Sequence, residues 1–179
     1  MRKTILLLAA LLAVAAAEET RREITNHTPR EGQPNDPKVP DAMAIEAGQF
    51  QRVLIFRFKY QTDLLDGITR MVKENHVKNA VILAGAGSVR GYQVHQVSNR
   101  TTPSKNIFVK DPEAPADLIG MNGYVLNGKV HAHMTLATPD KAFGGHLEPE
   151  TQVFTFAIVT VGVLPDSLDL SKLDVTDNR

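Results

Sequence analysis

The sequence contains no cysteine, and this absence excludes several kinds of chemistry. No disulfide can stabilise the fold, no thiol can act as a nucleophile, and no cysteine is available for lipid attachment. Stability must therefore come from packing or from oligomerisation. None of the serines lies in a Gly-x-Ser-x-Gly motif, so the sequence also lacks the serine nucleophile signature of the α/β-hydrolases.

The chain has no excess of either charge, because 20 basic residues balance 20 acidic residues. Without Arg2 and Lys3, 18 basic residues remain against 20 acidic ones, which is a net charge of −2. Proteins that bind nucleic acid neutralise phosphate groups with an excess of lysine and arginine. The composition therefore disfavours a nucleic-acid partner.

No apolar run is long enough to span a bilayer. The longest run starts at Ile5 and has ten residues to Val14, or thirteen with the alanines at 15–17, whereas a transmembrane helix needs about 20. Arg2 and Lys3 precede this run, and three alanines at positions 15–17 follow it. This order predicts a secretory signal peptide over residues 1–17, and hence a secreted or periplasmic chain that keeps no transmembrane anchor after cleavage.

The rest of the chain divides into three segments. Residues 18–48 are polar and rich in proline, without a periodic apolar face, and we expect them to be flexible. Residues 49–165 are enough for one compact domain. Residues 166–179 form a short acidic tail, which either packs as an edge or stays mobile.

Within residues 49–165 the pattern is strand, helix and then several strands. Residues 52–59 alternate between apolar and polar side chains, as in an amphipathic strand. Thr62 is the expected N-cap of a helix whose apolar stripe covers the sheet. Residues 153–163 are apolar on both faces, as in a central strand or a subunit interface. The pattern predicts an α/β (α+β) domain with a mostly antiparallel sheet and one main packed helix.

The segment 85–91 is rich in glycine but does not form a dinucleotide-binding fingerprint. Arg90 stands where that fingerprint needs glycine, and a strand-like alternation follows where it needs a helix. We expect a turn or a β-bulge here instead.

Three of the six histidines lie between positions 131 and 146. His131 and His133 are two apart on a predicted strand, so both side chains point to the same face, opposite the apolar set of that strand. The Gly144-Gly145 pair permits a tight backbone path that returns His146 toward them. Three imidazoles with one vacant position form a zinc-type site that can accept water or a ligand. A metal-free interpretation, with solvated or hydrogen-bonded histidines, stays open.

Other polar residues are less informative. His76 is interpreted as structural or solvated, and His95 as non-functional, because no paired ligand lies near it in sequence. Glu148 or Glu150 could act as a base beside a metal ion, but solvated loop positions are an equal expectation.

Several segments of the chain resemble the PPC domain, which plants and prokaryotes share. The resemblance covers roughly residues 50–165 and is carried by four motifs: Asn127 to Leu136, Phe143-Gly144-Gly145-His146-Leu147, the strand and glycine turn at 80–89, and Met121-Asn122-Gly123 as a strand-ending glycine. It implies a compact α/β domain, a homotrimer and metal binding by the three matched histidines. Two features differ from the family pattern: Glu148-Pro149-Glu150 replaces a frequent glycine, and residues 153–163 lack a frequent glutamate.

Three functions are compatible with these observations. The first is an exported, homotrimeric module that binds a divalent metal, with zinc expected, through His131, His133 and His146, and takes a small-molecule ligand at the open position. The second is DNA binding, as in plant relatives, although the Arg-Gly-Arg-Pro hook of those proteins is missing here. The third is a metal-free structural or interaction module. Whether the protein catalyses a reaction is left open.

Overall fold

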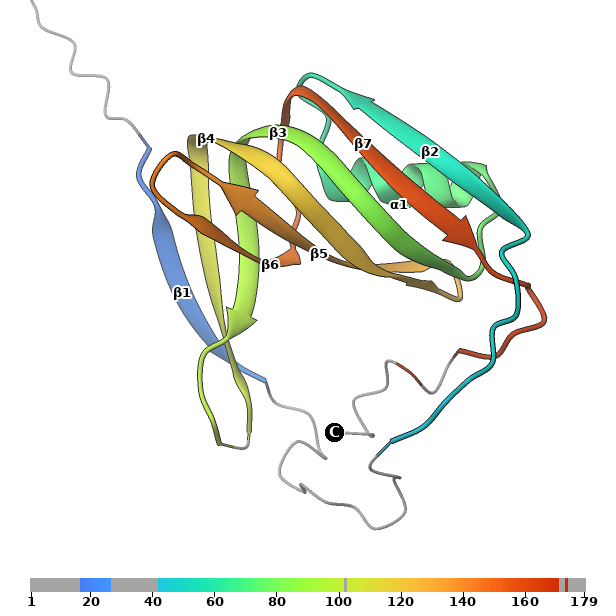
Figure 1. Ribbon diagram of the computed structural model, residues 1–179. Coiled ribbons are helices and arrows are strands. Elements are labelled where there is room, and N and C mark those ends of the chain that lie inside the picture. Colours follow the sequence, from blue (N-terminus) through green and yellow to red (C-terminus); the bar gives the residue numbers. More distant parts are fainter. Residues whose placement is uncertain (1–16, 27–41, 102, 171–172, 174–179) are drawn as a thin grey trace, which may run out of the picture.

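A computed structural model of the chain describes residues 17–26, 42–101, 103–170 and 173. These residues form strands and a helix that pack together as shown in Figure 1. The elements in chain order are β1 (Thr20–Thr25), β2 (Arg52–Lys59), α1 (Leu64–Glu74), β3 (Ala80–Val97), β4 (Lys105–Leu126), β5 (Lys129–Ala137), β6 (Ala142–Leu147) and β7 (Val153–Val163).

Every pairing between these strands is antiparallel, which confirms the fold class expected from the sequence. The strand order is β1-β4-β5-β6-β3-β7-β2, and β3 also pairs with β4. The pairings of β4 with β5, β5 with β6, β6 with β3 and β3 with β4 therefore form a closed circuit. The short strand β6 lies between β5 and β3 in this circuit, so it connects residues that are far apart in sequence.

The helix α1 packs on one face of the sheet (Figure 1). Leu64, Ile68 and Val72 follow each other at four-residue intervals and are all buried. Burial of each such side chain contributes about 1.5–3 kcal/mol. The N-cap is Asp63, whose Oδ1 accepts a hydrogen bond from the Asp66 N–H at 3.0 Å, so the prediction of Thr62 as the cap is wrong by one residue.

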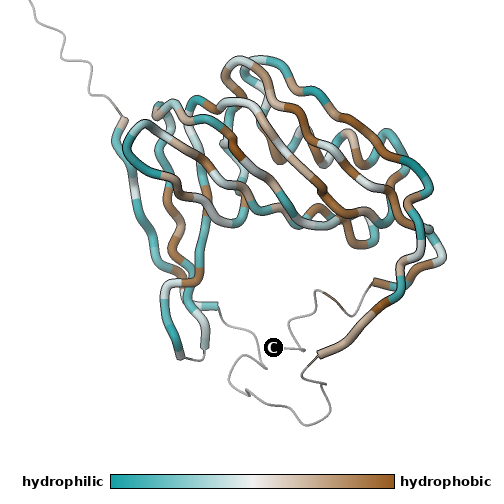
Figure 2. Tube along the Cα trace, in the orientation of Figure 1, coloured by the Kyte–Doolittle hydropathy of each residue, from teal (hydrophilic) through white to brown (hydrophobic). Residues whose placement is uncertain are grey.

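The core lies between α1 and the sheet, and alternate strand residues point into it. Hydrophobic segments follow the strands beside α1 in Figure 2, whereas β1 is mostly hydrophilic. The strand β7 lies between β3 and β2, and Val159 and Val161 are fully buried. Phe154 and Phe156 point the other way and are 42% and 40% exposed. Apolar residues therefore occupy both faces of β7, as the sequence predicts.

Of the turn and the β-bulge expected over residues 85–91, the structure shows bulge-type irregularities: β3 continues through this segment, with register shifts between Gly87 and Val89 and between Arg90 and Tyr92. The expectation for Gly123 is wrong, because Gly123 does not end a strand and β4 continues to Leu126. Its φ is +142°, and a Cβ there would lie 2.1 Å from the carbonyl oxygen of His131. Glycine at 123 thus permits the close approach of β4 to β5.

Some described residues on both sides of the expected domain, 49–165, pack against it. Within the segment 18–48 that we expect to be flexible, residues 20–25 form β1 and pair with β4, so that prediction is wrong for them. In the C-terminal tail, Leu170 is buried and the Asn79 amide donates a hydrogen bond to the carbonyl of Leu168 at 2.8 Å. The expected signal peptide lies outside the described residues, except for Ala17.

Candidate metal centre

The alternation of β5 places His131 and His133 on the face of the strand that points away from the core. Ala132 and Met134, on the opposite face, are 1% and 3% exposed. The two Nε2 atoms are 3.2 Å apart and the ring centroids 5.3 Å apart. This separation permits a hydrogen bond between the rings in the metal-free protein, and it also permits both lone pairs to bind one cation.

The third histidine reaches the same face through β6, because His146 lies directly opposite His133 in the pairing of β5 with β6. Neither of the two glycines before His146 has a positive φ. Glycine is needed there because the neighbouring strands approach the backbone too closely for a Cβ atom. A Cβ at Gly144 would lie 2.0 Å from the carbonyl oxygen of Met134, and one at Gly145 would lie 2.4 Å from that of His95. The glycine pair thus lets β6 fit between its two neighbours.

The three imidazoles form a compact cluster. The ring of His146 is nearly perpendicular to both others, with centroids 4.7 Å from His131 and 5.1 Å from His133. One ligand nitrogen from each ring lies within 4.8 Å of the others. A tetrahedral zinc ion with Zn–N distances of about 2.0–2.1 Å separates its nitrogens by about 3.3 Å. The donor set and the 3.2 Å pair fit such an ion, and the nitrogen of the third ring lies within 4.8 Å of this pair.

The electrostatic environment of His133 favours its neutral form. Partial burial lowers the pKa of this imidazole below 6.5, and the neighbouring His131 and His95 lower it further because a positive charge on them repels another. A neutral imidazole is the form that binds metals. The surroundings of His133 therefore prepare it for ligation.

The structure also brings His95 and Glu148 to this cluster, so His95 has potential ligand partners in space that it lacks nearby in sequence. His95 on β3 lies opposite His146 on β6, and their rings stack at 4.6 Å. The Nδ1 atom of His95 is 2.6 Å from Oε1 of Glu148. These two residues are 53 positions apart, and only the pairing of β3 with β6 brings them together. No local pattern in the sequence signals that pairing.

The remaining candidates lie elsewhere. Glu150 forms an ion pair with Lys110 at 2.5 Å and is exposed, so of the two glutamates only Glu148 reaches the histidines. His76 follows the end of α1, where its φ is +51° and its backbone N–H donates to the carbonyl of Lys73. The His76 side chain is exposed, which agrees with its interpretation as structural or solvated.

A cavity of about 340 Å³ lies beside His131 and His133. Asn122, Tyr124 and Leu126 of β4 line it together with Leu173 of the C-terminal segment. Asn122 and Tyr124 lie directly opposite His133 and His131 in the pairing of β4 with β5. The volume falls in the lower part of the range for small-molecule sites, about 300–1,000 Å³.

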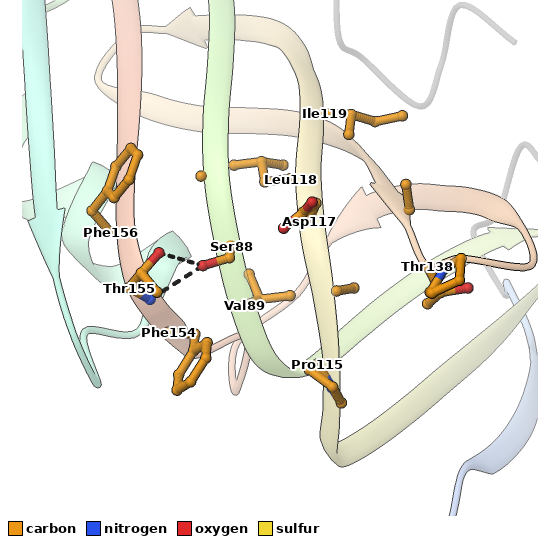
Figure 3. Close-up of a pocket in the computed structure, with 14 residues that line it drawn as sticks. Ser88, Val89, Pro115, Asp117, Leu118, Ile119, Thr138, Phe154, Thr155 and Phe156 are labelled. Carbon is orange, nitrogen blue, oxygen red and sulfur yellow. Dashed lines mark hydrogen bonds between the residues drawn. The ribbon is translucent and has the colours of Figure 1, made fainter.

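Figure 3 shows a larger cavity of about 810 Å³, whose lining includes none of the clustered histidines. Phe154 and Phe156 of β7 and Ile119 of β4 contribute apolar side chains to it. Ser88 and Thr155 also line it and share a hydrogen bond of 2.6 Å. The apolar lining and the absence of clustered metal-ligating groups distinguish this cavity from the histidine site.

The fold and the cluster together define a class: single α+β domains with an antiparallel sheet, one packed helix and a histidine site on an outward sheet face. The family model that matches the sequence is the Plants and Prokaryotes Conserved (PCC) domain, over residues 45–165. The chain therefore belongs to this family, which confirms the resemblance to the PPC domain seen in the sequence.

Solved structures with the same fold come from archaea and bacteria. A plant- and prokaryote-conserved (PPC) protein from Pyrococcus horikoshii superposes with a TM-score of 0.60 at 20% identity, over 76% of this chain and 94% of that one. A metal-containing protein from Archaeoglobus fulgidus gives 0.57 at 21% identity, over 68% and 86%. A candidate DNA-binding protein from Bacteroides thetaiotaomicron gives 0.52 at 18% identity, over 68% and 84%.

At these identities the structural similarities establish the fold alone. No curated protein matches the sequence. Among the residues that the structure describes, no helix is both long and apolar enough to cross a membrane.

Proposed function

We propose that this protein binds one divalent cation, with zinc the expected ion, through His131, His133 and His146. The observation that carries the proposal is the 3.2 Å separation of the Nε2 atoms of His131 and His133, with a third imidazole on the adjacent strand. Imidazole nitrogens are ligands that suit zinc, and three of them leave one coordination position open. The metal-containing relative from Archaeoglobus fulgidus supports this function.

The open position accepts a small molecule with an oxygen or nitrogen donor. The adjacent cavity of about 340 Å³ supplies the remaining contacts. Tyr124 and Leu126 offer apolar surface, whereas the Asn122 side chain can donate and accept hydrogen bonds. A bound cation would supply Lewis acidity to such a ligand. The contribution of this chain is to orient the ligand in the cavity beside the histidines.

We further propose that the protein is exported and assembles as a homotrimer. Export is supported by the charged start, the short apolar run and the alanines at 15–17 in the sequence. Assembly is supported by the exposed apolar side chains of β2, β4 and β7, which include Ile55, Ile119, Phe154 and Phe156. An exposed patch of this kind commonly marks a protein interface.

The metal proposal is tested with His133→Ala in protein purified without chelators after growth in medium containing zinc. We expect about one zinc ion per chain in the wild type. The zinc affinity of the variant should be lower by more than about 100-fold, which is the largest loss typical of residues that only orient a metal ligand. Elemental analysis after gel filtration measures this. His133 points outward, so the fold should persist, and circular dichroism checks that it does.

His76→Asn is the matched control, because it removes an imidazole away from the cluster and asparagine tolerates the positive φ at that position. Zinc retention by His133→Ala, or a wild type without zinc, would contradict the proposal and favour a metal-free structural module. A specific, nanomolar DNA complex at about 150 mM salt would favour the DNA-binding alternative, which the net charge opposes.

A further inference from the structure

A second group of potential ligands adjoins the three-histidine cluster. His95, His146 and Glu148 each offer one ligand atom, and these atoms lie within 4.8 Å of one another. Two of the three residues, His95 and Glu148, take no part in the zinc position described above. His146 belongs to both groups, because β6 lies between β5 and β3 and its pairings place His146 opposite His133 on one side and His95 on the other.

The side chains of this second group are held in place by their surroundings. His95 is stacked between Phe108 and His146, at ring distances of 4.9 Å and 4.6 Å. The backbone N–H of Glu148 donates to the carbonyl of Gln93 at 3.1 Å, and its own carbonyl accepts from the Thr151 hydroxyl at 3.1 Å. The side chains of His95 and Glu148 are only 21% and 19% exposed. The group is therefore preorganised and partly shielded from water.

The two groups differ in the ions that they suit. Three imidazoles favour zinc, whereas two imidazoles and a carboxylate form the ligand set of iron(II) sites, and carboxylates also suit manganese(II). A neutral imidazole has a single nitrogen lone pair, so His146 can serve only one ion at a time. Occupation of one position therefore excludes full occupation of the other.

We propose that His95, His146 and Glu148 form an alternative cation position, which takes manganese(II) or iron(II) and competes with zinc for His146. The proposal rests on the proposed zinc function for this competition, but the second position itself depends on His95 and Glu148. In the metal-free protein the His95 and Glu148 side chains hydrogen-bond to each other at 2.6 Å. A cation at this position replaces that hydrogen bond with two metal–ligand bonds.

The test uses the full chain with His131→Ala and His133→Ala combined, which removes two zinc ligands and leaves the second group intact. The probe is manganese(II), whose free-ion electron paramagnetic resonance signal decreases on binding. We expect about one manganese ion per chain in this double variant. In the wild type, added zinc should release bound manganese one for one.

Glu148→Gln, added to the double variant, should weaken manganese binding by at least about tenfold, because it removes the negatively charged ligand. Glu150→Gln is the matched control: it lies two residues away, pairs with Lys110 and is absent from the ligand group, so manganese binding should not change. Circular dichroism confirms that each variant is folded.

Absence of stoichiometric manganese in the folded double variant would overturn the inference. Equal effects of Glu148→Gln and Glu150→Gln would also overturn it, since the His95–Glu148 pair would then be a structural hydrogen bond only. If the double variant binds manganese through Glu148 but the wild type binds no zinc, the second position is supported and the proposed zinc function is contradicted. If the wild type binds zinc but the double variant binds no manganese, the zinc function is supported and the second position is contradicted.

Discussion

At the scale of single residues, His133 is the clustered histidine whose surroundings lower its pKa. It lies between β4 and β6, opposite Asn122 on one side and His146 on the other. Burial and two neighbouring imidazoles lower its pKa below 6.5. Metal binding and stability should therefore both depend on pH through this residue.

The direction of the pH effect follows from the lowered pKa. In metal-free protein the unfolded chain takes up a proton at His133 at higher pH than the folded chain does. The contribution of His133 to the free energy of unfolding is therefore complete above about pH 6.5 and decreases as the pH falls through the folded-state pKa. Urea unfolding with a chelator between pH 8 and 5 should show a smaller decline for His133→Asn than for the wild type. Equal declines would contradict this prediction.

The substitution Gly144→Ala tests whether the close approach of β6 to β5 is needed for stability. The Cβ of Gly144→Ala would lie 2.0 Å from a backbone oxygen, which cannot move without disturbing the β5–β6 pairing. We expect a loss of about 1–3 kcal/mol in the free energy of unfolding, with weaker zinc binding because His146 moves. Urea unfolding and zinc titration measure the two effects.

Gly120→Ala is the control for this substitution, because its Cβ would have no neighbour closer than 3.9 Å. A change of less than about 0.5 kcal/mol is expected at Gly120, as for substitutions away from packed features. Similar losses at both positions would show that the clash at Gly144 is not the cause.

At the scale of elements, β6 decides which ligands meet. It is a six-residue strand, yet it pairs with both β5 and β3. His133, His146 and His95 consequently occupy successive positions across three strands. Without β6 between β5 and β3, only His131 and His133 would stay together, because both lie on β5. The other candidate ligands would lie apart.

The edge strand β1 is attached partly by a side-chain hydrogen bond. The Tyr92 hydroxyl donates to Oε2 of Glu19, just before β1, at 2.9 Å. Burial, and then this contact with Glu19, raise the pKa of Tyr92. Tyr92→Phe should lower the free energy of unfolding by about 1–2 kcal/mol and increase hydrogen exchange in residues 20–25. Mass spectrometry of deuterium uptake measures the second effect.

Tyr124→Phe serves as the comparison, because Tyr124 is 47% exposed and does not pair with β1. We expect no change in the exchange of β1 in that variant. Unchanged exchange in Tyr92→Phe as well would mean that the other contacts of β1, namely its backbone pairing with β4 and the bonds of Glu23 to Ser98 and Lys105, hold this strand.

At the scale of the whole molecule, the uncovered apolar side chains of the sheet support the proposed homotrimer. Phe156 is 40% exposed and lies in the larger cavity of Figure 3, so a charge there should disrupt a subunit interface without entering the core. Light scattering should give about three chain masses for the wild type and one for Phe156→Glu. Arg70→Glu, on the exposed face of α1, should remain trimeric. A wild-type monomer at micromolar concentration would contradict the proposal.

The sequence by itself determined the features that depend on the local periodicity of apolar residues. A period of two residues in β5 set the outward direction of His131 and His133, and a helical period set the buried face of α1, because both periods reflect local backbone geometry. The antiparallel sheet and the family also follow from recognisable motifs in the chain.

The tertiary structure alone decided the features that depend on pairing between distant strands. The sequence TRREIT of β1 has too few apolar residues to predict a strand, and backbone hydrogen bonds to β4 make it one. His95 and Glu148 join the cluster because β6 pairs with β3, and such a register depends on how the whole sheet buries its apolar face. No segment of the chain contains that information by itself, so the second ligand group emerges only in the folded protein.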